Sequence, residues 1–221
     1  MILAIDVGNT NIVLGVYDGE ELVANWRITT LNNRTADETG TLIRSLFSHS
    51  NMDIKEIESV IISSVVPNIM YSLTNAIRKQ LHIEPMIVGA GMKTGINLRM
   101  ENPKEMGADR IVNLVAAYEI YGGPVVVVDY STATMFDVIS ENGEFITAIT
   151  APGVQVCADA LYQRAAQLPK IEIKKPESII AKNTVNSIQA GIVIGHIGET
   201  LYILEKLKEA FQKLMTALKP I

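Results

Sequence analysis

One short pattern occurs twice in the chain, and it constrains the fold more than any other feature. The first copy is Asp6-Val-Gly-Asn-Thr10 and the second is Asp129-Tyr-Ser-Thr-Ala-Thr134. Each copy follows a short apolar run typical of a buried strand, at 2–5 and 125–128, and leads into a second apolar strand. An acidic turn containing glycine comes next in both. The matching order predicts two related halves whose Asp carboxylates converge on one ligand.

Each turn offers groups that suit a nucleotide phosphate with its metal ion. Gly8 permits a tight bend that exposes backbone N–H groups, and Thr10 and Thr132 add hydroxyl groups. An Asp at the end of a strand, such as Asp6, can hold a hard cation or its waters. The alternative is a plain β-hairpin in which Asp and Thr side chains bind turn amides. Two copies in matching context favour the nucleotide.

Apolar periodicity predicts alternating strands and helices. The expected elements of the first half are strands at 2–7, 11–17 and 21–29, a helix at 36–50, a strand at 60–66, a helix at 68–81, a strand at 86–88 and a helix through 111–118 that Gly122-Gly123-Pro124 closes. The second half is expected to contain the repeat strands, a loop and short helix within 151–167, a polar link at 170–182 and a long helix at about 185–213. The last helix carries a small-residue face, Gly191, Gly195 and Gly198. Another backbone is expected to come close there, either in a dimer or within the same chain.

Composition and charge exclude several classes of protein. The 221 residues are 48% hydrophobic, as in an ordinary globular protein, and the net charge of −5 gives no electrostatic footprint for nucleic acid. The first residues lack a basic leader and reach Asp6 too soon for a signal peptide. No stretch approaches the roughly 20 apolar residues of a membrane span. We therefore expect a cytoplasmic location and no membrane or nucleic-acid partner.

The cysteine and histidine residues indicate no disulfide and no zinc site. Cys157 is the single cysteine, so no intramolecular disulfide can form. His49, His82 and His196 are scattered without zinc-ligand spacing. We expect the first two at the surface and His196 packed in a helix.

Five segments, taken in their order and spacing, resemble the type III pantothenate kinases, a bacterial branch of the actin, sugar kinase and Hsp70 superfamily. They are Asp6-Val-Gly-Asn-Thr-Asn-Ile-Val13, Ile62-Ser-Ser-Val-Val-Pro67, Asn102-Pro-Lys-Glu-Met-Gly-Ala-Asp-Arg-Ile-Val-Asn113, Ala151-Pro-Gly153 and Lys182-Asn-Thr-Val185. The match runs from residue 1 to about residue 200.

The resemblance implies an α/β fold made of two ribonuclease-H-like domains with ATP in the cleft between them. We place the domains at 1–121 and 122–221, the second shortened at its end. The implied reaction transfers the γ-phosphoryl group of ATP to pantothenate, giving 4′-phosphopantothenate in the first step of coenzyme A biosynthesis. Mg²⁺ and a monovalent cation, K⁺ or NH₄⁺, are the implied cofactors. The family also implies a homodimer.

For the nucleotide, the resemblance assigns roles to both hairpins. The residues carried over as contacts of the ATP phosphates are Asp6, Val7, Gly8, Asn9, Thr10, Asn11, Ile12 and Val13. Asp6 would help to hold Mg²⁺, Asp129 would bind the monovalent cation, and Thr132 would contact ATP.

For the acceptor, the resemblance implies a pantothenate site lined by Gly107, Ala108, Asp109, Arg110, Thr184 and, where many members have a tyrosine, Met100. Asp109 would be the general base that takes the proton of the attacking hydroxyl. Other roles for these residues stay open. Asp109 stands where a helix N-cap belongs, Arg110 can be a solvated surface cation, and Thr184 can cap the final helix.

The chain departs from the family pattern at several positions. Residues other than glycine stand where the family usually has glycine, at Ser131, Thr147, Ala148 and Ala181, and Met135 stands where Thr is common. A lost glycine costs roughly 1–3 kcal/mol if the backbone needs φ > 0 or a close approach to phosphate.

The end of the sequence also differs from the family. Members generally continue past the long helix with a strand that helps to enclose adenine, and its absence would expose a sheet edge. These departures favour an alternative, a catalytically degenerate paralogue with a ligand-binding or regulatory role. A kinase for another small molecule on the same fold is a third possibility.

Overall fold

The first half of the chain builds a five-stranded mixed sheet in a computed structural model, which describes residues 1–89 and 91–217 apart from the side chains of 104 and 212–217. The strand order is β3-β2-β1-β4-β5. The strands are β1 (Ile2–Val7), β2 (Asn11–Asp18), β3 (Glu21–Thr29), β4 (Ser59–Ser64) and β5 (Met86–Ile87). β1 pairs antiparallel with β2 and parallel with β4, so the carboxyl ends of β1 and β4 lie at the same edge of the sheet.

The two faces of this sheet carry different residues, because successive side chains of a strand point to opposite faces. On β1, Leu3, Ile5 and Val7 are buried against the cluster that includes Ile43 and Phe47 of α1. Each side chain buried in this way contributes roughly 1.5–3 kcal/mol. The opposite face carries the residues between them, including Asp6. The hydrophobic core therefore orients Asp6 away from itself.

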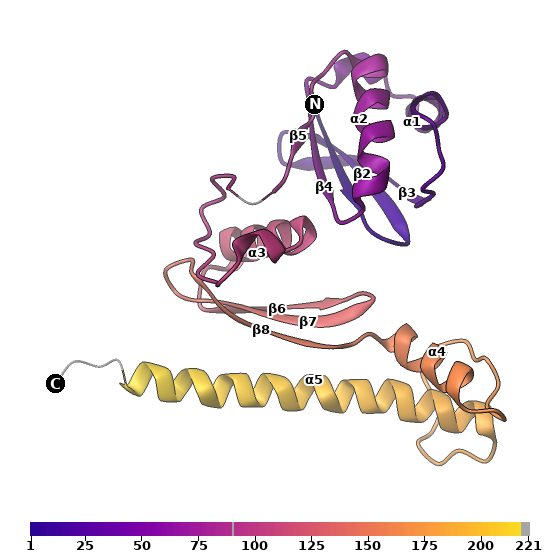
Figure 1. The fold of residues 1–221 in the computed structure, drawn as a ribbon, viewed down its shortest axis with the longest axis vertical. Coiled ribbons are helices and arrows are strands. Elements are labelled where there is room, and N and C mark those ends of the chain that lie inside the picture. Colours follow the sequence, from indigo (N-terminus) through magenta and orange to yellow (C-terminus); the bar gives the residue numbers. More distant parts are fainter. Residues whose placement is uncertain (90, 218–221) are drawn as a thin grey trace. The chain divides into compact units, whose positions relative to one another are not determined.

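Helices α1 (Ala36–His49) and α2 (Pro67–Leu81) lie side by side on the apolar face (Figure 1). α1 begins with a capping box in which the Thr35 hydroxyl accepts from the Glu38 N–H and the Glu38 carboxylate accepts from the Thr35 N–H. The hydrogen bonds that the Thr35 N–H and the Thr35 hydroxyl donate to the Glu38 carboxylate lower the pKa of that carboxyl. α2 begins at Pro67, which suits the first helical turn, and ends at His82 in a left-handed conformation.

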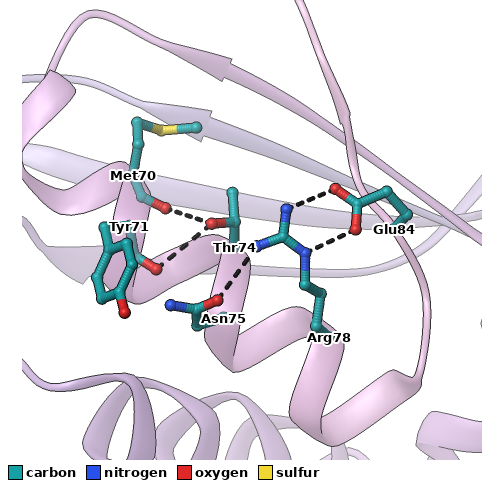
Figure 2. Close-up of polar contacts among 6 residues, drawn as sticks. All are labelled: Met70, Tyr71, Thr74, Asn75, Arg78 and Glu84. Carbon is teal, nitrogen blue, oxygen red and sulfur yellow. Dashed lines mark hydrogen bonds and ion pairs between the residues drawn. The ribbon is translucent and has the colours of Figure 1, made fainter.

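The outer side of α2 carries a local polar network (Figure 2). The Thr74 hydroxyl donates to the Met70 carbonyl at 2.8 Å, within the helix. Beyond the helix end, Nε and Nη2 of Arg78 each donate to one oxygen of the Glu84 carboxylate at 2.6 Å. The forked hydrogen bonds lower the pKa of Glu84 and raise that of Arg78. This exposed pair links the end of α2 to the segment that enters β5.

Helix α3 (Ala108–Tyr121) packs against β4 and ends at Gly122, whose φ of 71° is left-handed. Two short 3₁₀ turns, Ile54–Glu56 and Pro103–Glu105, precede β4 and α3. The elements predicted for the first half of the chain are thus confirmed.

The second half contains a three-stranded sheet, β6 (Val125–Tyr130), β7 (Ala133–Ile139) and β8 (Phe145–Pro152), in that order. Two helices follow, α4 (Val154–Arg164) and α5 (Thr184–Ala217), separated by the predicted polar link. The chain divides into two compact units. The first comprises Met1–Val125 and Val138–Thr147, and the second Val126–Asp137 and the chain from Ala148 onward. The domain boundary placed at residue 121 stays a prediction.

Helix α5 corrects one expectation. In the part of the chain that the structure describes, its segment Thr184–Phe211 is long and apolar enough to cross a membrane by length and composition alone, a test that the core helix of a soluble protein also passes. The sequence prediction overlooked it because glycine, threonine and histidine interrupt the apolar residues without adding formal charge. The cytoplasmic location stays a prediction.

Candidate functional site

The first repeat turn joins β1 to β2 and is held by hydrogen bonds from within and from β3. The Gly8 N–H donates to the Asn11 carbonyl at 2.9 Å, which closes the turn. Thr30, directly after β3, donates its hydroxyl to the Gly8 carbonyl at 2.7 Å and its N–H to the Thr10 carbonyl at 3.0 Å. The side chains of Asn9 and Thr10 are exposed. The turn is therefore fixed in shape while its tip stays accessible to a ligand.

The strand residues of this hairpin that are predicted to contact ATP phosphates lie on two different faces of the sheet. Val7 and Ile12 are 0% and 5% exposed and belong to the core, so that only their backbone groups can reach a ligand. Asp6 and Val13 are register partners on the opposite face. Asp6 is exposed there, in the part of the strand that leads into the turn.

A cavity of about 270 Å³ lies on this opposite face of the first sheet. Its lining includes Asp6, Ser63 and Val112, the last from α3. Ser63 is 6% exposed, and its hydroxyl has no hydrogen-bond partner among the described residues. Ser63 lies in the segment Ile62–Pro67, for which the sequence indicated no role. The available signal was the pair Ser63-Ser64 inside the apolar run 60–66.

The carboxylate of Asp109 lies at the start of α3. Gly107 is the N-cap, so the alternative that Asp109 is the N-cap residue is wrong; Asp109 stands inside the first turn. Its Oδ1 accepts from the Arg110 N–H at 2.7 Å. A side chain at Gly107 would overlap this Oδ1. Gly107 therefore leaves the space in which the Asp109 carboxylate lies.

The neighbours of Asp109 in the predicted acceptor site differ in exposure. Ala108 is buried, whereas Asp109 and Arg110 are half-buried. The Arg110 guanidinium lies 5.8 Å from the centroid of the Phe145 ring, so it is a packed cation rather than a fully solvated one. Met100 is half-buried in the segment between β5 and α3.

The second repeat turn, between β6 and β7, is one residue shorter than the first. The Ser131 N–H donates to the Ala133 carbonyl at 3.0 Å, and the Gly153 N–H donates to the Thr132 carbonyl at 3.1 Å. A side chain at Gly153 would overlap the carbonyl groups of Ser131 and Thr132. Thr132 is exposed, and Asp129 is half-buried near the end of β6.

The replaced glycines do not strain the backbone through a left-handed φ. Among the described residues, the non-glycine positions with positive φ are Asn51 and His82. Ser131, Thr147 and Ala148 therefore have conformations that any residue adopts, as does Ala181. The expected conformational cost of these substitutions does not arise.

Thr184 is the first residue of α5 and is exposed. The side chain of Asn183 accepts from the Asn186 N–H at 2.8 Å, so Asn183 caps this helix. The alternative that Thr184 caps the helix is wrong.

Three further expectations for side chains can be compared with the structure. His49 and His82 are exposed and His196 is buried, as expected. The sequence did not indicate that His196 Nε2 lies 2.8 Å from the fully buried Thr134 hydroxyl.

Inside the second compact unit, the small-residue face of α5 meets no close neighbour among the described residues, because a side chain added at Gly191, Gly195 or Gly198 would have no atom within 4 Å. Close packing inside that unit therefore does not account for these glycines. A dimer stays a prediction.

Comparison with known proteins identifies relatives over most of the chain. The sequence model of a family described as type III pantothenate kinase matches residues 2–206. A conserved Campylobacter jejuni protein, described as a proposed Baf family transcriptional activator, is 17% identical, with a TM-score of 0.51 over 92% of this chain and 77% of that one. MreB 5 of Spiroplasma citri is 13% identical, with a TM-score of 0.47 over 94% of this chain and 78% of that one. The family match covers most of the chain, and the similarity to the Campylobacter jejuni structure, together with the sheet topology, shows a shared α/β fold.

Proposed function

Because the chain belongs to the type III pantothenate kinase family, we propose that it transfers the γ-phosphoryl group of ATP to pantothenate, giving 4′-phosphopantothenate. Membership of a kinase family supports phosphoryl transfer and the use of ATP. The choice of pantothenate as acceptor rests on the family and on the motif around Asp109. The observation that carries the proposal is the Asp109 carboxylate held at the start of α3 by the Arg110 N–H.

Asp109 is the group to which we assign the proton transfer. A hydrogen bond from a backbone N–H fixes one carboxylate oxygen, and the helix N-terminus favours the negative charge. A fixed carboxylate can orient the acceptor hydroxyl and take its proton as the new O–P bond forms and the bond to the β-phosphate oxygen breaks. Arg110, Gly107, Ala108, Met100 and Thr184 are proposed contacts of the acceptor.

The first hairpin is assigned to the nucleotide phosphates. Its accessible tip offers backbone N–H groups and the side chains of Asn9 and Thr10, which can donate hydrogen bonds to phosphate oxygens. Thr132 offers a hydroxyl group on the second hairpin. Positioning and charge neutralisation are the main requirements of phosphoryl transfer, and both hairpins supply groups of the right kind.

Asp6 is the residue that we assign to Mg²⁺ on this sheet face. No group of three or more His, Cys, Asp or Glu side chains suited to a metal occurs among the described residues, so a cation must take most ligands from phosphates and water. Asp6 offers a carboxylate, and the unpartnered buried hydroxyl of Ser63 lines the same cavity. When bound, Mg²⁺ supplies charge neutralisation on the phosphate oxygens. Asp129 is the proposed residue for K⁺ or NH₄⁺.

One argument for the degenerate-paralogue alternative, a left-handed backbone at the positions where the family has glycine, does not apply to this chain, because Ser131, Thr147, Ala148 and Ala181 have no positive φ. The other argument, that glycine lets the backbone come close to a phosphate, is tested by the activity assay. The kinase is the function that we favour. A homodimer that uses the small-residue face of α5 remains part of the proposal, as the family implies.

The direct test is formation of phosphopantothenate by the purified chain with ATP, Mg²⁺ and K⁺. We expect product from the wild type and a loss of turnover of about 100-fold or more in Asp109→Asn. The variant keeps the shape of the side chain, and circular dichroism checks that it is folded. Unchanged turnover in Asp109→Asn would refute the assignment of the base. ATP-dependent phosphorylation of other small alcohols, without pantothenate turnover, would support a different kinase on the same fold.

A further inference from the structure

A cavity of about 270 Å³ lies beside helix α5, among residues of the second compact unit. Much of its surface is apolar and is formed by Val154, Ile173, Val193 and Ile197. Its polar lining residues are Tyr130, His196 and Thr200, and among the described residues no Asp, Glu, Lys or Arg lines it. An apolar cavity with a few convergent polar groups is the usual form of a small-molecule site. None of these residues has a role in the proposed kinase reaction.

This cavity lies on the face of the second sheet that contacts α5. The Tyr130 hydroxyl of β6 donates to the Thr200 hydroxyl of α5 at 3.1 Å. The Thr134 hydroxyl of β7 lies 2.8 Å from Nε2 of His196, also on α5. Tyr130 directly follows Asp129 in β6, so these two side chains point to opposite faces of the sheet. The cavity is therefore a site apart from the carboxylate that we assign to the monovalent cation.

His196 is the lining residue with an unused hydrogen-bonding group. The residue is 8% exposed, and its ring packs against that of Tyr130 with the centroids 5.8 Å apart. The Thr134 hydroxyl is fully buried, and His196 Nε2 is the acceptor that the described residues offer to it. The hydroxyl therefore donates to Nε2, because a buried O–H group without an acceptor would destabilise the fold. In the neutral ring the proton then lies on Nδ1, which becomes a donor.

The Nδ1 donor of His196 is open to the cavity. No described residue accepts from it, yet it keeps some accessible surface, unlike the enclosed hydroxyl of Ser63. His196 has little exposed surface elsewhere, so the accessible side of its ring is the side that lines the cavity. Tyr130 and Ile197 are 57% and 54% exposed, which leaves a path by which a molecule can enter from solvent. The cavity thus offers one donor, among apolar side chains, to an incoming acceptor.

We propose that this cavity binds a small uncharged molecule that has an apolar body and a carbonyl group. The carbonyl oxygen accepts from His196 Nδ1, and the apolar body packs against Ile173, Val193 and Ile197. The molecule is uncharged because an ionised group would lose its hydration where no opposite charge lines the cavity. An apolar cavity of roughly 150 Å³ in another protein binds benzene, so a substituted benzene ring fits the larger space here. The inference does not depend on the proposed kinase function.

Two fluorinated probes of nearly the same shape test the site in the full chain. The first, para-fluoroacetophenone, has the carbonyl group, and the second, para-fluoroethylbenzene, has a methylene group in its place. Titrations followed by fluorine nuclear magnetic resonance give the dissociation constant of each. Val193→Phe fills the cavity, and Ile194→Phe, at the next position and outside the lining, is the matched control. We expect both probes to bind the wild type and Ile194→Phe equally well, and Val193→Phe at least about tenfold more weakly.

A double variant, His196→Leu with Thr134→Val, separates the hydrogen bond from the apolar contacts. It removes the Nδ1 donor without leaving the buried Thr134 hydroxyl unpaired, and thermal unfolding checks that it is folded. We expect it to bind para-fluoroacetophenone about fivefold more weakly than the wild type does, with little change for para-fluoroethylbenzene. Equal losses for the two probes would overturn the proposed hydrogen bond to a carbonyl group. A wild type that binds neither probe, or equal weakening in Val193→Phe and Ile194→Phe, would overturn the site itself.

Discussion

An equivalent backbone hydrogen bond holds each of the two repeat hairpins, but the further interaction that fixes each turn is different. In the first, the residue directly after the third strand, Thr30, donates its N–H to the Thr10 carbonyl; in the second, the equivalent Gly153 donates its N–H to the Thr132 carbonyl. Thr30 adds a side-chain hydrogen bond to Gly8. Gly153 adds none and instead brings its backbone so close that no side chain fits.

This difference shows how a duplicated structure diverges while keeping its geometry. The first hairpin has three turn residues and is secured by a hydroxyl group, whereas the second has two and is secured by the absence of a side chain. The helices that follow the two hairpins also differ in whether a side chain takes part. α1 has the capping box of Thr35 and Glu38 at its start, whereas the N-cap of α4 is Gly153, which offers no side chain.

The largest effect should come from exchanging the two Asp carboxylates for amides. Asp6→Asn is expected to lower kcat/KM for ATP with Mg²⁺ by about 100-fold, because it removes a charged cation ligand from the first hairpin. Asp129→Asn should lower activity by about tenfold and weaken its dependence on K⁺. Steady-state kinetics with separate Mg²⁺ and K⁺ titrations measure both. Equal losses with the same cation dependence would show that the two halves do not hold different cations.

Two alanine substitutions test what fixes each hairpin. One replaces Gly8, in the first turn, and the other replaces Gly153, whose backbone packs on the second turn. Gly153→Ala should lower the free energy of unfolding by about 2–3 kcal/mol, since its Cβ would overlap two carbonyl groups. Gly8→Ala should cost less than about 1 kcal/mol, because its Cβ would meet one atom, the Asn11 carbonyl oxygen, at 3.3 Å. Urea denaturation of both variants gives the comparison. A smaller loss in Gly153→Ala than in Gly8→Ala would contradict it.

Removing the hydroxyl of Thr30 isolates the extra hydrogen bond of the first hairpin. Thr30→Val keeps the shape of the side chain and the backbone hydrogen bond to Thr10 but deprives the Gly8 carbonyl of a donor. We expect a loss of about 1 kcal/mol in urea denaturation. Thr29→Val, at the neighbouring exposed position, is the control and should change stability less.

The capping box of α1 should produce the smallest effect, and one that depends on pH. The folded-state pKa of Glu38 is lowered by hydrogen bonds from the Thr35 backbone and hydroxyl. Its stabilising contribution is therefore present above the unfolded pKa near 4.5 and is lost as the pH falls through the lower folded-state value. The stability difference between the wild type and Glu38→Gln should shrink between pH 7 and pH 3.5 in urea denaturation. A constant difference would mean that the Glu38 charge contributes nothing.

The sequence predicted the secondary structure well because local patterns determine it. The alternating residues of β1 and the Pro67 that begins α2 are read directly from the chain, and the family motifs pointed to Asp6 and Asp109. The repeat also predicted the two hairpins. That the Asp6 and Asp129 carboxylates act on one bound nucleotide stays a prediction.

Features that depend on contacts between distant segments could not be predicted. Gly153 is 21 residues away from the Thr132 carbonyl that it binds, and no local pattern links them. The unpartnered hydroxyl of Ser63 became visible once β1 and β4 were paired. The sequence placed the start of the final helix at about residue 185, which made Thr184 a candidate cap, whereas the helix begins one residue earlier and Asn183 caps it.

The overlap between a side chain at position 107 and the Asp109 carboxylate has a consequence for how such sequences diverge. A Cβ at position 107 would push the Asp109 carboxylate out of the position that it has here, whereas in a chain without that carboxylate the Cβ would meet only the Val65 side chain, at 3.3 Å. The two positions should therefore change together during evolution, and the glycine then acts as a record of whether selection still maintains the carboxylate. In this chain both Gly107 and Asp109 are retained.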